Sequence, residues 1–242
     1  MPKPQPAVGT GRVRRPRGSM SADEIVNGAF DVARGISLDK LSMPGLAEHL
    51  GVGVTSIYWY FRKKEELLNA MTDVAAGKYA EAIPPPEPGE TWQRTLRVHF
   101  EAYRRVLSDD ATLADLLLIR TSTYSRDATR RVYEVEEAVL AVLIEQGFTP
   151  DSALRVYNAT SVYTRGMVIH DRILRLSQAP TVDGGHRQRR MADWNSMPIL
   201  DSLIDERPLA GTTDEDFAFG IERLIRGFEQ LLTDQDRGAV QG

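Results

Sequence analysis

The sequence predicts an all-α protein with a small N-terminal helical domain and a larger helical domain after it. Apolar residues recur at helical spacing through most of the 242 residues, and a glycine or proline follows several of these runs. No segment shows the alternating apolar and polar residues of a β-strand. A proline-rich stretch over 84–88 separates the two parts, so we expect domains over residues 19–82 and 91–233.

The first helix is expected to begin at Ser21, which has capping-box spacing to Glu24, and to end at Gly35. Its apolar stripe consists of Ile25, Ala29, Phe30, Val32 and Ala33. Leu38 and Leu41 in the following linker are expected to join the same core.

Two short helices joined by a glycine turn are expected next, over about 44–50 and 54–60. Gly51 can adopt the left-handed conformation that closes a helix, and the small Ala47 allows the two helices to cross closely. The second helix is expected to turn three aromatic side chains largely toward solvent: Tyr58, Trp59 and Tyr60. Because exposed aromatic residues usually mark a binding surface, the pair has the form of a DNA-binding helix-turn-helix.

This region resembles the DNA-binding domain of the tetracycline-repressor (TetR) family. The similarity lies in Leu46 to Val52, Ile57 to Phe61 and Lys64 to Leu67, in this order and spacing. The resemblance implies a homodimer whose recognition helices enter successive major grooves of a palindromic operator, about 34–36 Å apart. The candidate DNA-binding residues of this region are Ser42, Thr55, Ser56, Tyr58, Trp59, Tyr60, Lys63 and Lys64. Lys64 matches a family lysine that contacts phosphate, whereas Trp59 could equally be a domain-packing residue.

The first 18 residues carry basic side chains and no acidic residue, among prolines and glycines. Such a segment cannot bury a core, so we expect it to be disordered when free. One interpretation is a solvated tail; the other is a basic arm in which Arg15 and Arg17 neutralise phosphates or enter a minor groove. The net charge of the chain is −4, so any DNA footprint must be local.

The chain is expected to be helical beyond these elements, apart from the proline-rich stretch and a polar loop over about 178–198. A connecting helix runs to about Ala82, and later helices are expected over about 92–107, 111–119, 127–146, 150–176 and 214–232. The last helix repeats apolar residues in coiled-coil-like steps: Phe217, Ile221, Leu224, Phe228 and Leu231.

The larger domain resembles the tetracycline-repressor subgroup of the same family. The matching motifs are Trp92-Gln93, Glu145 to Phe148, Asn195 to Pro198, Phe219 to Glu222 and Gly227 to Glu229. The resemblance implies a small-molecule effector pocket and a homodimer formed by the helices at about 151–176 and 214–232. Gly166, Gly220 and Gly227 agree with close helix packing, because a mid-helix glycine is costly unless close backbone approach offsets it.

The candidate effector-binding residues are His99, Tyr103, Arg120, Tyr124, Val139, Asn158 and His170. The resemblance places His99 and Tyr103 at effector-contacting positions, and His170 where the subgroup extends a carboxylate into the partner's site. Each histidine could equally be a packed core or interface residue. Arg120 and Tyr124 could receive an anionic or phenolic ligand.

The subgroup holds magnesium through a histidine that follows the short helix, but residues 119–124 contain no histidine. His170 also replaces an acidic residue, and magnesium prefers oxygen ligands. We therefore expect no bound metal and no cofactor, and an effector other than tetracycline with magnesium.

Composition excludes several other classes of protein. The chain has no cysteine, which excludes disulfides and thiol chemistry, and no apolar run approaches the ~20 residues of a membrane span. The N-terminus is too polar for a secretory signal, so we expect a cytoplasmic protein. No nucleophile motif or phosphate loop accompanies His99 or His170, so we do not expect an enzyme. The remaining alternatives are a helical protein-interaction module and an effector-dependent activator.

Overall fold

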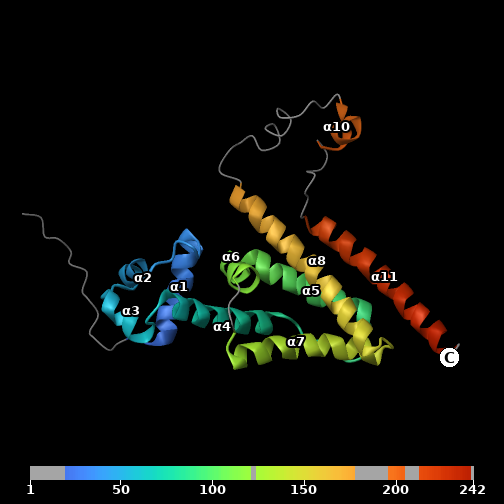
Figure 1. Cartoon of the computed structure of the whole chain (residues 1–242), viewed down its shortest axis with the longest axis horizontal. Helices are drawn as coiled ribbons and strands as arrows, with labels where there is room; N and C mark the ends of the chain where they lie inside the picture. The colour runs from blue at the N-terminus through green and yellow to red at the C-terminus, as the bar shows by residue number, and fades with distance from the viewer. Residues whose placement is uncertain (1–19, 121–123, 178–195, 205–212, 241–242) are drawn as a thin grey trace, which may run out of the picture. The chain divides into compact units, whose positions relative to one another are not determined.

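The computed structural model (Figure 1) describes residues 20–120, 124–177, 196–204 and 213–240. Within these ranges the regular structure is helical and no strand occurs, which confirms the predicted all-α class. The chain divides into two compact units, and the division falls between Val74 and Ala75, inside helix α4 (Lys64–Ala82). The proline-rich stretch, where we expected the boundary, lies further along the chain.

The first unit contains three short helices, α1 (Ala22–Ile36), α2 (Met43–Leu50) and α3 (Val54–Tyr60), and the beginning of α4. Helix α2 packs against both α1 and α3, and Figure 1 shows the three helices in one cluster. Their shared core is almost completely buried and includes Ile25, Ala29, Phe30, Leu46, Ile57 and Leu67. Leu38 and Leu41 are buried as well, as expected. Burying each large apolar side chain contributes about 1.5–3 kcal/mol, which is what stabilises so small a domain.

The two ends of α1 differ in how well the sequence predicts them. Ser21 and Glu24 form the expected capping box: the Glu24 N–H donates to the Ser21 hydroxyl at 3.1 Å, and the Ser21 N–H donates to the Glu24 carboxylate at 2.8 Å. The prediction that Gly35 ends the helix is wrong. The helix continues past it, and Ser37 adopts a φ of 75° while its N–H donates to the Ala33 carbonyl at 2.9 Å. Because a serine at positive φ is uncommon, a pattern that looks for glycine misses this helix end.

The helix-turn-helix has the predicted start and turn. The Ser42 hydroxyl accepts a hydrogen bond from the Gly45 N–H at 3.1 Å and thereby caps α2. Gly51 has a φ of 69°, and its N–H donates to the Glu48 carbonyl at 3.1 Å. Helix α3 then buries Ile57 completely, which fixes the face that α3 turns to solvent.

The second unit is built around α8 (Pro150–Ser177), which packs against α5 (Trp92–Asp109), α7 (Arg126–Glu145) and α11 (Asp214–Val240). Figure 1 shows α8 and α11 running side by side. The core of this unit includes Leu96, Phe100, Leu107, Leu116, Leu143, Val156 and Ile221. These helices have close to their expected bounds, except that α11 continues well beyond residue 232.

The predicted helix over 111–119 is not a single α-helix. It consists of α6 (Ala111–Ala114) and a π-helical turn, η1 (Asp115–Ile119), in which the Arg120 N–H donates to the Asp115 carbonyl at 2.9 Å. Arg172 of α8 donates two hydrogen bonds to the Asp115 carboxylate, at 2.9 and 3.1 Å, and so holds η1 against α8. A π-helical turn changes the hydrogen-bond partners more than the apolar spacing, so the sequence pattern does not reveal it.

Gln146 joins the end of α7 to the start of α5. Its side-chain oxygen accepts from the Trp92 N–H at 2.9 Å, and its side-chain nitrogen donates to the Glu90 carbonyl at 2.7 Å. The Trp92 ring also packs edge-on against Phe148, with centroids 5.1 Å apart. Two of the motifs that carry the resemblance to the tetracycline repressors are therefore in contact.

Gly220 is required by the contact between α8 and α11. A Cβ atom at this position would collide with the phenol of Tyr163, whose hydroxyl donates to the Asp216 carbonyl at 3.0 Å. Gly166 and Gly227 face open space within the protomer. Close packing inside one chain therefore accounts for one of the three mid-helix glycines.

The segment after α8 was predicted to be a loop over about 178–198. Residues 178–195 lie outside the described residues, as does the basic arm with Arg15 and Arg17. Pro198 begins a short helix, α10 (Pro198–Ile204), so the end of the loop prediction is wrong at this residue. Proline suits the first turn of a helix because it needs no hydrogen-bond acceptor there.

Candidate functional site

Helix α3 presents polar and aromatic side chains to solvent. Buried Ile57 holds its inner face, while Thr55, Tyr58 and Trp59 are exposed, Tyr58 by 45% and Trp59 by 78%. Ser56 is half-buried beside them. A tryptophan this exposed is not packed into the core of its own unit, so it is available to a partner.

Tyr60 differs from the other two aromatic residues of α3. Its hydroxyl donates a hydrogen bond to the main-chain carbonyl of Met20, and its side chain is half-buried. The expectation that Tyr60 is largely solvent-facing is therefore wrong. The Tyr60 ring also supports Trp59 edge-on, with centroids 4.7 Å apart.

Ser42, Lys63 and Lys64 surround the beginnings of α2 and α4. The Ser42 hydroxyl is used as the cap of α2, and the Lys64 ammonium donates to the Asp39 carbonyl at 3.3 Å. Lys63 is exposed immediately before α4. At this helix start the Arg62 N–H already donates to the Glu66 carboxylate at 2.8 Å, so the end is capped by a side chain from within the helix. Because Lys63 and Lys64 stand at the start of α4, they place positive charge beside a helix N-terminus, and this arrangement favours phosphate.

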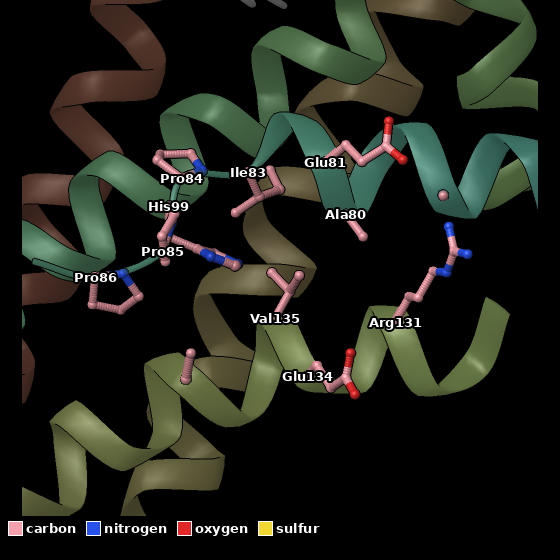
Figure 2. A pocket seen from close by; sticks show the side chains of 12 residues that line it. Ala80, Glu81, Ile83, Pro84, Pro85, Pro86, His99, Arg131, Glu134 and Val135 are labelled. Carbon is pink, nitrogen blue, oxygen red and sulfur yellow. The ribbon is translucent and has the colours of Figure 1, made fainter. Parts of the chain in front are cut away.

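The second unit contains a cavity of about 320 Å³ between the end of α4, the proline-rich stretch, α5 and α7 (Figure 2). Its walls include Ala80, Ile83, Pro84, Pro85, Pro86 and Val135, and His99 of α5 lies beside Pro85 among them. Glu81, Arg131 and Glu134 supply its charged side chains. A mostly apolar cavity of this size with a few polar groups is typical of a small-molecule site.

His99 is the buried polar residue of this cavity, with 2% of its surface exposed. Its Nε2 lies 3.5 Å from the Tyr157 hydroxyl, and its ring packs edge-on against Phe100. Burial lowers the pKa of His99 to about 4, so the imidazole is neutral at physiological pH. Among the described residues no hydrogen-bond partner reaches its Nδ1.

A second, much smaller cavity of about 30 Å³ is lined by tyrosines and by one charged pair. Tyr79, Tyr103 and Tyr124 lie around it with Glu136 and Arg165, and the Arg165 Nε donates to the Tyr103 hydroxyl at 2.9 Å. Burial raises the pKa of Glu136, while the Arg165 charge and a hydrogen bond from Tyr157 favour its carboxylate form. The space admits a water molecule but not an organic ligand.

The predicted effector residues divide between these cavities and other places. His99 lines the larger cavity, and Tyr103 and Tyr124 line the smaller one. The other four line neither of the two: Arg120, Val139, Asn158 and His170. Val139 is buried in the core and Asn158 is exposed on α8. Arg120 and His170 are half-buried.

Several residues of these cavities were not singled out from the sequence. They are Tyr79, Pro84, Pro85, Pro86, Arg131, Glu136 and Arg165. Tyr157, which contacts His99, is likewise not indicated by the sequence. The sequence pattern of the prolines predicts a domain boundary, although a rigid run of this kind can also form a wall. Tyr157 and Arg165 lie on α8 with a spacing that places both toward α5, but nothing local to α8 indicates the partner helix.

The described ranges hold no group of three or more histidine, aspartate or glutamate side chains that could bind a metal ion. Across the same ranges, no helix combines the length and the apolar character needed to cross a membrane.

Family models match both units of the chain. Residues 25–71 match the family described as bacterial regulatory proteins, tetR family, and residues 85–232 match the tetracyclin repressor-like C-terminal domain. The proteins of these families are transcriptional regulators and not enzymes, in agreement with the expectation that the chain is not an enzyme.

Individual proteins agree with this assignment. An HTH-type transcriptional repressor of Mycobacterium tuberculosis is 40% identical over 230 residues, covering 94% of this chain and 87% of that protein. A structure described as a possible TetR family transcriptional regulator from Streptomyces coelicolor A3(2) has a TM-score of 0.70 at 21% sequence identity. The match covers 87% of this chain and 100% of that chain. The structure of the Streptomyces coelicolor TetR family protein ActR in complex with actinorhodin has a TM-score of 0.64 at 23% sequence identity. The match covers 86% of this chain and 96% of the ActR chain. The chain belongs to the TetR family of bacterial transcriptional regulators, and its second unit is a tetracycline-repressor-like C-terminal domain.

Proposed function

We propose that this protein is a sequence-specific DNA-binding repressor that acts as a homodimer and is released from a palindromic operator by a small molecule. The observation that carries the proposal is the exposed face of α3. Thr55, Tyr58 and Trp59 project from the second helix of a helix-turn-helix whose inner face is fixed by buried Ile57. Repression, rather than activation, is supported by the description of the mycobacterial relative as a repressor.

Short hydroxyl groups cannot make the bidentate base contacts of arginine or asparagine. Thr55, Ser56 and Tyr58 therefore read the operator through thymine methyl groups, sugars and DNA shape, while Lys63 and Lys64 contribute affinity that does not depend on sequence. Arg15 and Arg17 of the basic arm add phosphate or minor-groove contacts in the same proposal.

Dimerisation through α8 and α11 is supported by apolar side chains that the protomer leaves exposed. Val162 of α8 is 70% exposed and Phe219 of α11 is 66% exposed, and both helices carry a glycine with open space beside it. An uncovered apolar surface of this kind on adjacent helices is characteristic of an interface between subunits.

Effector binding in the second unit is supported by the cavity beside His99 and by the neighbouring tyrosine cluster. ActR, which shares the fold, binds actinorhodin in its solved complex. In this proposal the protein has one conformation that matches the operator and one that does not. An effector that binds the second conformation more tightly lowers DNA affinity, by at most the difference between its binding free energies for the two conformations.

Fluorescence anisotropy against the protein's own upstream intergenic DNA, at two salt concentrations, tests the DNA-binding step. Wild-type protein should bind tightly at low salt and weaken steeply as salt rises, because bound phosphates release counterions. Tyr58→Ala should weaken binding about tenfold, the size of one good base-edge or methyl contact. Tyr133→Ala is a matched control, since Tyr133 is an exposed helical tyrosine of α7. If neither this DNA nor a sequence selected from a random pool binds at low salt, the proposal is wrong.

A further inference from the structure

The cavity beside His99 is lined mostly by residues that offer a ligand no hydrogen-bond donor. Pro84, Pro85 and Pro86 form one wall in Figure 2, and proline has a carbonyl but no backbone N–H. Ile83 and Val135 add apolar surface without polar atoms in their side chains. The chemistry of His99 therefore decides which polar group of a ligand is recognised here.

The hydrogen bonds behind His99 determine which ring nitrogen carries the proton. The Tyr157 hydroxyl lies 3.5 Å from the His99 Nε2 and is also hydrogen-bonded to Glu136. A hydroxyl has one proton to donate, and a carboxylate stabilised by the charge of Arg165 is the stronger acceptor. Tyr157 therefore donates to Glu136 and accepts from the Nε2–H of His99. The other ring nitrogen, Nδ1, is left with a lone pair.

This Nδ1 is buried and has no hydrogen-bond partner among the residues that the structure describes. The opposite tautomer would leave an N–H donor unpaired in the same place, which proteins tolerate less well than an unpaired acceptor. A ligand hydroxyl satisfies the lone pair by donating to it. A carboxylate has no proton to donate, and burial lowers the pKa of His99 to about 4 in the free protein, so the neutral ring offers an incoming anion no positive charge.

We propose that this cavity binds uncharged, mainly apolar molecules through a phenol or alcohol group that donates a hydrogen bond to Nδ1 of His99. The inference rests on the proposed function, because it assigns a chemical class to the effector of the second unit. Of the charged side chains at the cavity, Arg131 is accompanied by Glu81 and Glu134, so the local charge does not favour an anion.

Three probes of similar shape test the hydrogen-bond requirement: 2-naphthol, 2-methoxynaphthalene and 2-naphthoate. Isothermal titration calorimetry with the full chain at neutral pH should show that 2-naphthol binds about tenfold or more tightly than either of the others. The methoxy compound keeps the ring but has no proton to donate. The naphthoate tests discrimination against an anion.

Two substitutions of His99 separate its role in binding from its role in packing. His99→Gln keeps a nitrogen near the Nε2 position for Tyr157 and removes the acceptor at Nδ1, so the preference for 2-naphthol should disappear. His99→Asn keeps an oxygen near the Nδ1 position and should restore part of the preference. His49→Gln is the control, since His49 is exposed on α2 of the first unit and lines no part of the cavity. Thermal melting by circular dichroism verifies that each variant is folded.

Nitrogen NMR of labelled histidine provides a measurement that needs no ligand. The free protein should show His99 protonated at Nε2 and unprotonated at Nδ1. The proposal is overturned by the opposite tautomer, by equal binding of the three probes, by preferred binding of naphthoate, or by no binding of any probe. A preference that survives in His99→Gln also overturns it.

Operator release is measured separately, so the two proposals can fail independently. If 2-naphthol binds with the expected preference but leaves DNA affinity unchanged, the ligand class is supported and the effector role of the cavity is not. If another molecule releases the DNA while none of the naphthalene probes binds, the proposed release by a small molecule is supported and the ligand class of this cavity is overturned.

Discussion

His99 makes the stability of the second unit depend on pH. Burial lowers its pKa from 6.5 to about 4, so the unfolded chain takes up a proton at a higher pH than the folded chain does. The stability that the neutral ring contributes is complete above the ordinary pKa and is lost as the pH falls toward about 4. Lowering the pH from about 7.5 to about 5 should therefore cost about 2 kcal/mol of unfolding free energy through this residue. Urea unfolding at both pH values measures the loss, and His99→Gln should lack it; equal losses in the two proteins would contradict the assignment.

Ser42 and Thr55 are both hydroxyl residues of the candidate DNA surface, but Ser42 also caps a helix. Ser42→Ala should lower the free energy of unfolding by about 1 kcal/mol, because the Gly45 N–H loses its acceptor. Thr55→Ala, at an exposed position, should change stability by less than about 0.5 kcal/mol and act mainly on DNA affinity. Thermal unfolding and anisotropy on the same two variants separate the effects. A large stability loss in Thr55→Ala would show that this hydroxyl is structural.

At the residue scale, local patterns predict local interactions. The Ser21 capping box and the Gly51 turn follow from spacing over a few residues, and both occur as expected. The partner of Tyr60 is a carbonyl far back in the chain, so nothing around Tyr60 indicates that its hydroxyl is used. Arg165 and Tyr103 are likewise joined across two helices, which explains why the sequence pointed to one of them and not to the other.

At the element scale, an ion pair between Arg172 and Asp115 holds η1 against α8. Arg172 and Asp115 are mostly buried and share two hydrogen bonds, each of a kind worth about 1.5–3 kcal/mol. Asp115→Asn should therefore destabilise the turn by about 1–3 kcal/mol and leave α5 unaffected. Hydrogen exchange should show lost protection confined to residues 115–120. Arg130→Gln is the control, because its pair with Glu134 is exposed on α7. Unchanged exchange in Asp115→Asn would mean that packing alone holds η1.

The sequence predicts which segments are helical, but it does not predict how each helix ends or where a π-helical turn occurs. Each expected helix occurs, because apolar spacing reports which face is buried whatever the partner is. The end of α1 at Ser37 depends on a positive φ value, and the π-helical turn at η1 depends on its hydrogen-bond partners; neither changes the apolar spacing.

At the scale of the whole molecule, the exposed apolar residues of α8 and α11 make a prediction about assembly. Val162→Glu and Phe219→Glu should each shift the protein toward monomer in analytical ultracentrifugation, because a charge would be buried without a partner. Operator binding should fall with them, since one protomer reaches half of a palindrome. Tyr133→Glu, on an exposed part of α7, should do neither. A dimer that survives both substitutions would place the interface elsewhere.

The fold class and the family could be predicted for the whole molecule because the helix-turn-helix motif and the second set of motifs occur in order along the chain. The cavity could not be predicted in the same way. Its walls come from α4, the proline-rich stretch, α5 and α7, and the residues that meet there are distant in sequence.

The hydrogen bond between Tyr60 and Met20 also affects how the protein can be labelled or fused. Met20 is tied to the last residue of α3, so anything attached upstream is covalently tethered beside the helix that is proposed to read DNA. A fluorophore or a fused protein joined directly before Met20 would therefore compete with the operator for the same space, and the length of chain left between the two sets how far that competition is relieved. The other end of the chain belongs to the second unit, so a label attached there is not joined to the unit that contains α3.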